Sequence, residues 1–359
     1  MKKNFQRTYL AFIIFILSGM LFGCGANDTT ASGNDTATDN QTLSSWNDSS
    51  VNKQAILDFV ESVTDEKSDN YVPVEERIAT FDMDGTIVVE KKIWLELAVA
   101  VYRIDNELSD DKELVAEKDK LLEYIAMDPE PDDTGQLIVD VTGKAFQGMS
   151  QEDFVAYMNK FMQEEKPDFP GLTYKDCFYK PMLELLQYLQ NNDFTVYIVS
   201  GSERGVIWGA TSEVVKLPRS QMIGADITLT AGNGESSSGG SGHSVFEPED
   251  TLIRGLGFTQ RSVNMDKVYN IFHQIGIRPI LACGNTDGDF SMLNYAKYNP
   301  NHAGLALLIN HDDDAREYRY NTRERDDWDA LAKQYGWNVI SMKDEFNTIF
   351  LKEAEKVAE

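Results

Sequence analysis

A short apolar run that ends in two closely spaced carboxylates is the feature that most constrains this chain. The residues Ile78-Ala-Thr-Phe81 are rich in β-formers and predict a buried strand. Asp82 and Asp84 follow, and Gly85 then lets the backbone turn sharply. Two acids are therefore expected at the carboxyl end of a strand, which is where open α/β sheets bind their ligands.

Other polar residues also follow predicted strands. The runs 194–199 and 280–283 are apolar and predict two more strands, and helical patterns separate them. Strands that alternate with helices predict an α/β fold, here a Rossmann-like parallel sheet with helices on both faces. The polar residues that follow the two strands, together with one helical lysine between them, are Ser200, Gly201, Lys267, Asn285 and Asp289.

Residues 91–176 interrupt this alternation of strands and helices. Apolar residues recur there at helical spacing, and the predicted helices cover 93–104, 114–125 and 154–162. We expect this block to be an inserted, mainly helical cap, and the segments 52–90 and 177–359 to form the core. The Gly/Ser-rich stretch 231–244 is expected to be a flexible excursion.

The N-terminus has the pattern of an export signal rather than of a folded element. Basic residues precede the apolar run 9–22, which is shorter than the roughly 20 residues of a membrane span. With Cys24 directly after a glycine, residues 1–23 resemble a bacterial lipoprotein signal peptide, and a plain secretory signal is the alternative. Residues 24–51 are polar and are expected to be a flexible tether. The mature protein is then lipid-anchored through Cys24 to a membrane of the bacterial cell envelope, outside the cytoplasm.

The charge argues against a nucleic-acid-binding protein, and the cysteine content excludes a fold held by a framework of disulfides. The net charge of −26 leaves no basic surface for phosphate neutralisation, so we expect no nucleic-acid binding. Beyond Cys24 there are only Cys177 and Cys283, which allow one disulfide at most. Cys283 lies in a predicted strand and is expected to be a buried thiol.

Taken in order, these clusters resemble the four motifs of the haloacid dehalogenase (HAD) superfamily. The motifs are Asp82-x-Asp84-Gly85-Thr86, Ser200 at a strand end, Lys267, and Gly284-Asn285-x-x-x-Asp289, and the resemblance covers roughly residues 53–350. The helical insert resembles the cap of the phosphoserine-phosphatase-like branch. The context of the first motif, from Arg77 to Glu90, is similar to exported acid or phosphorylcholine-type phosphatases.

The resemblance implies Mg²⁺-dependent hydrolysis of a small phosphate monoester through an aspartyl-phosphate. It implies that Asp82 is the nucleophile and Asp84 the general acid and base. The remaining residues implied for catalysis and for binding the substrate are Thr86, Lys267, Ser200, Gly201 and Glu90. The implied Mg²⁺ ligands are Asp82, the Asp84 backbone carbonyl, Asn285 and Asp289. Because Asn285 stands where the family has an acid, it stays open which of Asn285, Asp287 and Asp289 contacts the metal.

Other functions stay open to different degrees. A dehalogenase needs no second acid, so Asp84 argues against it, and a phosphomutase needs a sugar bisphosphate that an exported protein would not meet. A non-catalytic lipoprotein that binds phosphate esters and a phosphoserine-specific phosphatase remain as alternatives. Trp94 is expected to pack in the core, with a cationic-head-group pocket as the alternative. The sequence names neither the ester nor the oligomeric state.

Overall fold

The computed structural model describes residues 42–91, 93–127, 129–232, 245–320, 328–353 and Lys356. The predicted signal over 1–23, Cys24, the tether up to residue 41 and residues 233–244 of the predicted excursion lie outside these residues. Within the described part, no helix is both long and apolar enough to cross a membrane.

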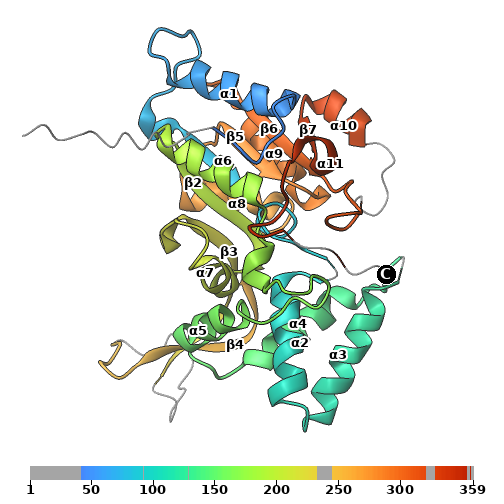
Figure 1. Ribbon diagram of the computed structural model, residues 1–359. Coiled ribbons are helices and arrows are strands. Elements are labelled where there is room, and N and C mark those ends of the chain that lie inside the picture. Colours follow the sequence, from blue (N-terminus) through green and yellow to red (C-terminus); the bar gives the residue numbers. More distant parts are fainter. Residues whose placement is uncertain are drawn as a thin grey trace, which may run out of the picture. The chain divides into compact units, whose positions relative to one another are not determined.

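The described residues form one mostly parallel sheet with helices on both faces, which confirms the predicted fold class (Figure 1). Its seven strands lie in the order β4-β3-β2-β1-β5-β6-β7, and only β3 and β4 pair antiparallel. The strands are β1 (Ile78–Phe81), β2 (Thr195–Glu203), β3 (Met222–Gly232), β4 (Thr251–Gln260), β5 (Leu281–Gly284), β6 (Leu305–Asn310) and β7 (Asn338–Ser341).

The strand order places a topological switch beside β1. From β1 the chain runs through β2, β3 and β4 on one side, and it then continues with β5, β6 and β7 on the other. Phe81 at the end of β1 is in register with Ile198 of β2 and Cys283 of β5. The residues that follow these three positions therefore emerge together at the carboxyl edge, where doubly wound sheets bind ligands.

Both faces of the central strands β1, β5 and β6 are buried, which explains why these strands are almost continuously apolar. In β6, Leu305, Leu307 and Ile309 belong to one hydrophobic core, and Ala306 and Leu308 belong to the other. The helices outside the 91–176 block are α1 (Val51–Thr64), α6 (Lys180–Asn191), α7 (Arg204–Thr211), α8 (Met265–Gln274), α9 (Phe290–Lys297), α10 (Trp328–Tyr335) and α11 (Met342–Glu345).

Residues 91–176 are helical, and they include one helix that the sequence did not predict. Their helices are α2 (Leu95–Glu107), α3 (Lys112–Tyr124), α4 (Thr134–Phe146) and α5 (Gln151–Phe161). The missed helix, α4, contains two glycines and several β-branched residues, so its intrinsic helix propensity is low. Packing against α2, α3 and β4 supplies its stability instead (Figure 1).

The unpredicted strand β4 is fixed to its surroundings by one buried arginine. The guanidinium of Arg254 donates to Glu203 at 2.9 Å and to Gln151 at 2.8 Å. It also lies 3.6 Å from the centre of the Phe154 ring. These contacts join the β3–β4 hairpin to the end of β2 and to α5, so the hairpin becomes a wall of the pocket described below.

The packed body begins earlier than predicted. Trp46 is fully buried, and its indole N–H donates to the carbonyl of Pro181 at 3.0 Å. Its ring meets Phe346 edge-on at 4.8 Å. The C-terminal end of the predicted tether 24–51 is therefore wrong, because residues 43–50 belong to the fold. Cys177 and Cys283 are both free and buried.

Candidate active site

The loop after β1 is a tight turn that only glycine can close. The amide of Asp82 donates to the carbonyl of Cys283 at 2.9 Å, which continues the pairing of β1 with β5. The amides of Thr86, Ile87 and Val88 then donate to the carbonyl of Met83. Gly85 has a φ of +75°, and a Cβ there would overlap the side chains of Asn285, Glu90 and Tyr320. The close approach of these residues explains the glycine.

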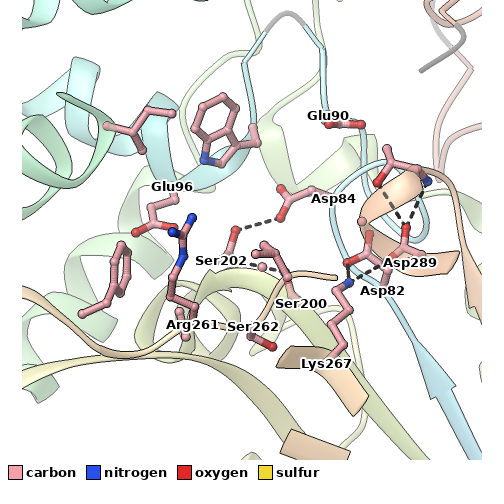
Figure 2. Close-up of a pocket in the computed structure, with 18 of the residues that line it drawn as sticks. Asp82, Asp84, Glu90, Glu96, Ser200, Ser202, Arg261, Ser262, Lys267 and Asp289 are labelled. Carbon is pink, nitrogen blue, oxygen red and sulfur yellow. Dashed lines mark hydrogen bonds and ion pairs between the residues drawn. The ribbon is translucent and has the colours of Figure 1, made fainter. Parts of the chain in front are cut away.

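A buried lysine joins the acids of the first and fourth motifs (Figure 2). The ammonium of Lys267 lies 2.6 Å from Oδ1 of Asp82 and 2.6 Å from Oδ1 of Asp289. It also donates to the carbonyl of Val199 at 2.8 Å. Lys267 is only 3% exposed, so these three bonds hold it away from solvent. Predicted residues from β1, α8 and the loop after β5 therefore meet at one point.

Asp289 organises the turn after β5. Its Oδ2 accepts hydrogen bonds from the amides of Asn285 and Thr286, each at 3.0 Å. Gly284 makes room for this carboxyl group, because a Cβ at that position would overlap the side chain of Asp289. Asp287 is exposed and begins the short 3₁₀ turn of this loop. Asp289 is thus the acid that faces the centre, and Asp287 is not.

Asp84 connects the core to the first helix of the 91–176 block. Its Oδ2 accepts from the hydroxyl of Ser202 at 2.8 Å, and its Oδ1 accepts from the amide of Leu95 at 3.2 Å. Leu95 is the first residue of α2. Asp84 therefore lies where the core and this block meet. Its carboxyl group is held by Ser202 of the core and by the amide of Leu95 of this block.

The acids of this centre outnumber its cations. Burial, and then the charge of Asp289, raise the pKa of Asp82 to about 8, although Lys267 opposes the shift. Burial also raises the pKa of Asp84 to about 6. For Lys267, burial lowers the pKa, but the charges of Asp289 and Asp82 outweigh it and the net shift is upward. One ammonium therefore serves two carboxylates, and the centre lacks one positive charge when both are ionised.

The surrounding oxygen atoms fit a hard divalent cation. In the described ranges, no three His, Cys, Asp or Glu side chains converge closely enough to hold a metal by themselves. The hydroxyl of Thr86, however, lies 3.3 Å from Oδ2 of Asp82 and 3.2 Å from Oδ1 of Asn285. The amide oxygen of Asn285 thus lies on the Asp82 side. Mg²⁺ accepts such carboxylate, amide and backbone oxygens and keeps several waters.

Behind the first-motif loop, a buried histidine supports the turn. His311 Nε2 lies 2.7 Å from the carbonyl oxygen of Gly85, and Nδ1 lies 3.2 Å from Glu317. Glu317 is fully buried and accepts from the hydroxyl of Tyr179 at 2.9 Å. Tyr320 stacks on His311 and donates to Glu90 at 2.8 Å. The segment after β6 therefore fixes both Gly85 and Glu90.

These residues open onto a cavity of about 300 Å³. The predicted residues that line it are Asp82, Asp84, Glu90, Ser200, Gly201, Lys267 and Asp289 (Figure 2). Thr86 and Asn285 lie directly behind Asp82, as the hydrogen bonds above show. The hydroxyl oxygen of Ser200 accepts from the amide of Ser202 at 3.1 Å. The structure thus brings together every predicted site residue except Cys24, which lies outside the described residues.

Sequence reasoning missed several other residues that line this cavity. They include Trp94, Glu96, Gly135, Ile138, Val139, Ala225, Phe258, Arg261, Ser262 and Val263. Burial, and then the charge of Glu203, raise the pKa of Glu96 to about 8.

Ser202 could have been predicted as a site residue, because it lies two residues after Ser200 on the same strand and therefore on the same face. No sequence pattern assigned the residues of α4 and of the segment after β4 to the site, because neither α4 nor β4 was predicted.

Comparison with known proteins gives similarity of structure only. No family model matches the chain, and no curated protein matches it. A conserved functionally unknown protein from Anaerococcus prevotii is 15% identical with a TM-score of 0.46, covering 72% of this chain and 85% of its own. Cytosolic 5′-nucleotidase IIIB bound to cytidine is 14% identical with a TM-score of 0.43, covering 80% and 84%.

A phosphoserine phosphohydrolase-like protein from Francisella tularensis is 14% identical with a TM-score of 0.38, covering 74% of this chain and 94% of its own. Another similar structure is described as a HAD family hydrolase from Salmonella enterica. At such identities and TM-scores, the evidence for function has to come from the residues of this chain.

Proposed function

We propose that the chain is a Mg²⁺-dependent phosphatase that hydrolyses a small phosphate monoester through an aspartyl-phosphate on Asp82. The observation that supports this most directly is the buried centre in which Lys267 contacts both Asp82 and Asp289 at 2.6 Å, beside Asp84 and a cavity. A carboxylate nucleophile, a second acid and a fixed cation are the groups that such a reaction needs.

In the first step, a carboxylate oxygen of Asp82 attacks phosphorus. The new Asp82–phosphorus bond forms as the ester's bond between phosphorus and its alcohol oxygen breaks. Asp84 donates its proton to the departing oxygen, which leaves as the alcohol. The raised pKa of Asp84, at about 6, leaves a protonated fraction in mildly acidic solution. Asp82 must be ionised to attack, and a cation bound beside it would lower its pKa from about 8.

In the second step, water hydrolyses the aspartyl-phosphate. Asp84, now ionised, takes a proton from the water as it attacks phosphorus, and orthophosphate leaves with Asp82 restored. Ser202 holds the carboxyl group of Asp84 at 2.8 Å in position for both proton transfers. Ser200 and the amide of Gly201 are the donors that bind the phosphoryl oxygens. Lys267 adds positive charge beside them, because its three N–H groups already bond to Asp82, Asp289 and the carbonyl of Val199.

Mg²⁺ would be held by Asp82, the Asp84 backbone carbonyl and Asn285, with waters completing its shell. When bound, it supplies positive charge against the phosphoryl oxygens and the carboxylates. We favour Asn285 over Asp289 as the direct ligand. Asp289 accepts hydrogen bonds from Lys267 and from two backbone amides, which hold it in the turn. Among the described residues, Oδ1 of Asn285 accepts from Thr86, the same hydroxyl that contacts Asp82, so it lies on the Asp82 side.

Purified chain with Cys24→Ala should release phosphate from an aryl phosphate with Mg²⁺ and lose this activity in EDTA. Asp82→Asn and Asp84→Asn should each reduce turnover by several orders of magnitude, and Asp287→Asn is the matched control because Asp287 is exposed. An active Asp82→Asn variant would overturn the mechanism. Binding of many esters without turnover would favour the non-catalytic alternative. A panel with phosphoserine and phosphorylcholine tests the choice of ester.

We also propose that the chain is lipid-anchored through Cys24 outside the cytoplasm, which the N-terminal sequence pattern supports. In a bacterial host, the wild-type chain should sediment with membranes and incorporate labelled fatty acid. Cys24→Ala should lose the label and leave the membrane fraction. A labelled Cys24→Ala variant, or an unlabelled wild type, would refute the anchor.

A further inference from the structure

The hydroxyl group of Ser262 is a buried donor without a partner at the wall of the cavity. Ser262 is 1% exposed, and its Oγ has no hydrogen-bond partner among the described residues. Leaving a buried polar group unpaired costs about 1–3 kcal/mol, so native proteins rarely do so without a reason. The other serines of this site are engaged: Ser202 donates to Asp84, and the Oγ of Ser200 accepts from the Ser202 amide.

The backbone around Ser262 is strained and held in place. Asn264 has a φ of 51° and a ψ of −127°, a conformation that glycine adopts readily and other residues avoid. Its amide donates to the carbonyl of Gly288 at 3.0 Å, which ties the segment to the fourth-motif turn. Strain of this kind costs roughly 1–3 kcal/mol and is typically found at functional sites.

The same segment packs against the second motif and leads into the helix of Lys267. A Cβ placed on Gly201 would lie 3.1 Å from the side chain of Val263 and 3.8 Å from the carbonyl oxygen of Ser262. Lys267 follows five residues after Ser262 and lies in the first turn of α8. Figure 2 shows Ser262 on the side of the cavity where Ser200 and Lys267 lie.

We propose that Ser262 is a further substrate-binding residue, whose hydroxyl donates a hydrogen bond to a phosphoryl oxygen of the bound ester. The inference rests on the proposed function, because that function places an oxygen-rich anion between Ser200, Gly201 and Lys267. Such an anion is the ligand that an unpaired O–H beside an ammonium would bind. The strained turn at Asn264 keeps the hydroxyl at this wall while the site is empty.

Orthophosphate is the probe that tests this role, because it carries the phosphoryl oxygens and no alcohol group. Ser262→Ala should raise the inhibition constant of orthophosphate, and the KM of an aryl phosphate, about tenfold, which corresponds to one hydrogen bond to a charged group. Ser262→Thr, which keeps a hydroxyl, should recover most of this loss. Ser62→Ala is the control, since that serine bonds to Phe59 within α1.

A purely structural serine would give a different result. Ser262→Ala removes an unpaired hydroxyl, so without phosphate its melting temperature should match or exceed that of the wild type. Only the stabilisation that orthophosphate and Mg²⁺ add should shrink. A lower melting temperature with unchanged phosphate affinity would overturn the inference. If the wild type neither hydrolyses esters nor binds orthophosphate, the proposed function fails as well; if it does both and Ser262→Ala behaves identically, only this inference fails.

Discussion

Replacing Lys267 with methionine removes the ammonium that contacts both Asp82 and Asp289. Asp289 would then be buried without this counter-charge, and so would Asp82 once it ionises. Breaking a buried ion pair by removing one partner costs about 3–5 kcal/mol, because the remaining charge stays desolvated. Unfolding entropy is about 2.1 cal/mol/K per residue, so for a body of about 300 residues we expect the melting temperature to fall by roughly 5–8 °C.

The loss should depend on pH with a definite sign. The pKa of Asp82 in the folded protein is about 8 even with Lys267 present, and it rises further without it. A carboxyl group whose folded-state pKa is raised destabilises the fold progressively as pH rises above its unfolded value near 4. Up to about pH 8, Asp82 stays largely protonated in both folded proteins and they lose stability in parallel, so the extra loss in Lys267→Met should grow above pH 8 and be larger at pH 9 than at pH 5. Added Mg²⁺ should restore part of the stability, because it replaces the missing charge.

Thermal unfolding followed by circular dichroism at the two pH values, with and without Mg²⁺, measures these effects. The double variant Asp82→Asn/Lys267→Met should be more stable than Lys267→Met alone, since one uncompensated charge is gone. Lys120→Met is the control, because Lys120 and its partner Asp133 are both well exposed. A Lys267→Met protein that melts like the wild type, or that loses more stability relative to the wild type at pH 5 than at pH 9, would refute the reasoning.

Three further predictions concern two strand ends beside the site, at Ser202 and Gly284, and the buried Trp46. Ser202→Ala removes a hydrogen bond that lowers the pKa of Asp84, so the alkaline limb of kcat/KM against pH should move to higher pH. Gly284→Ala forces a Cβ into Asp289, and such overpacking should cost about 1–3 kcal/mol in urea unfolding and reduce activity. Trp46→Ala should lower the free energy of unfolding by about 3–5 kcal/mol, because the side chain is fully buried.

Each of these predictions has an outcome that would contradict it, and the two stability predictions also have a control variant. A Ser202→Ala limb that moves to lower pH contradicts the assignment of Asp84 as the acid. Gly135→Ala, where a Cβ has open space within α4, should not destabilise, so equal losses at both glycines contradict the steric argument. Val51→Ala changes a side chain that is 76% exposed and should leave stability nearly unchanged. A Trp46→Ala protein as stable as Val51→Ala would mean that residues 43–50 are not part of the fold.

The centre of the fold was predictable because its strands are buried on both faces. The run Ile78–Phe81 is short, apolar and followed by Gly85, and no helix pattern competes with it. The position of Lys267 opposite Asp82 followed only from the order of the motifs, since the two residues are far apart in the chain. Sheet topology then brings them within 2.6 Å.

The cavity residues that come from α4, β4 and the segment after β4 were not predictable from the sequence, for physical reasons. Helix α4 contains Gly135 and Gly143, and it forms because it packs between other elements rather than from its own propensity. Strand β4 contains Gly255 and Gly257 and lies at the edge of the described sheet, beside β3. Both elements depend on contacts distant in sequence, so Phe258 and Ser262 could not be assigned to the site beforehand.

The burial of Trp46 also limits how far the folded body can lie from the membrane. If Cys24 carries lipid, as proposed, only the 18 residues between Cys24 and Leu43 separate the bilayer from the first packed part of the body. Even fully extended, they span no more than about 65 Å at roughly 3.3–3.6 Å per residue. The folded body would then stay within this distance of the membrane. If it has the proposed activity, it would encounter esters released at that surface before those that diffuse farther away.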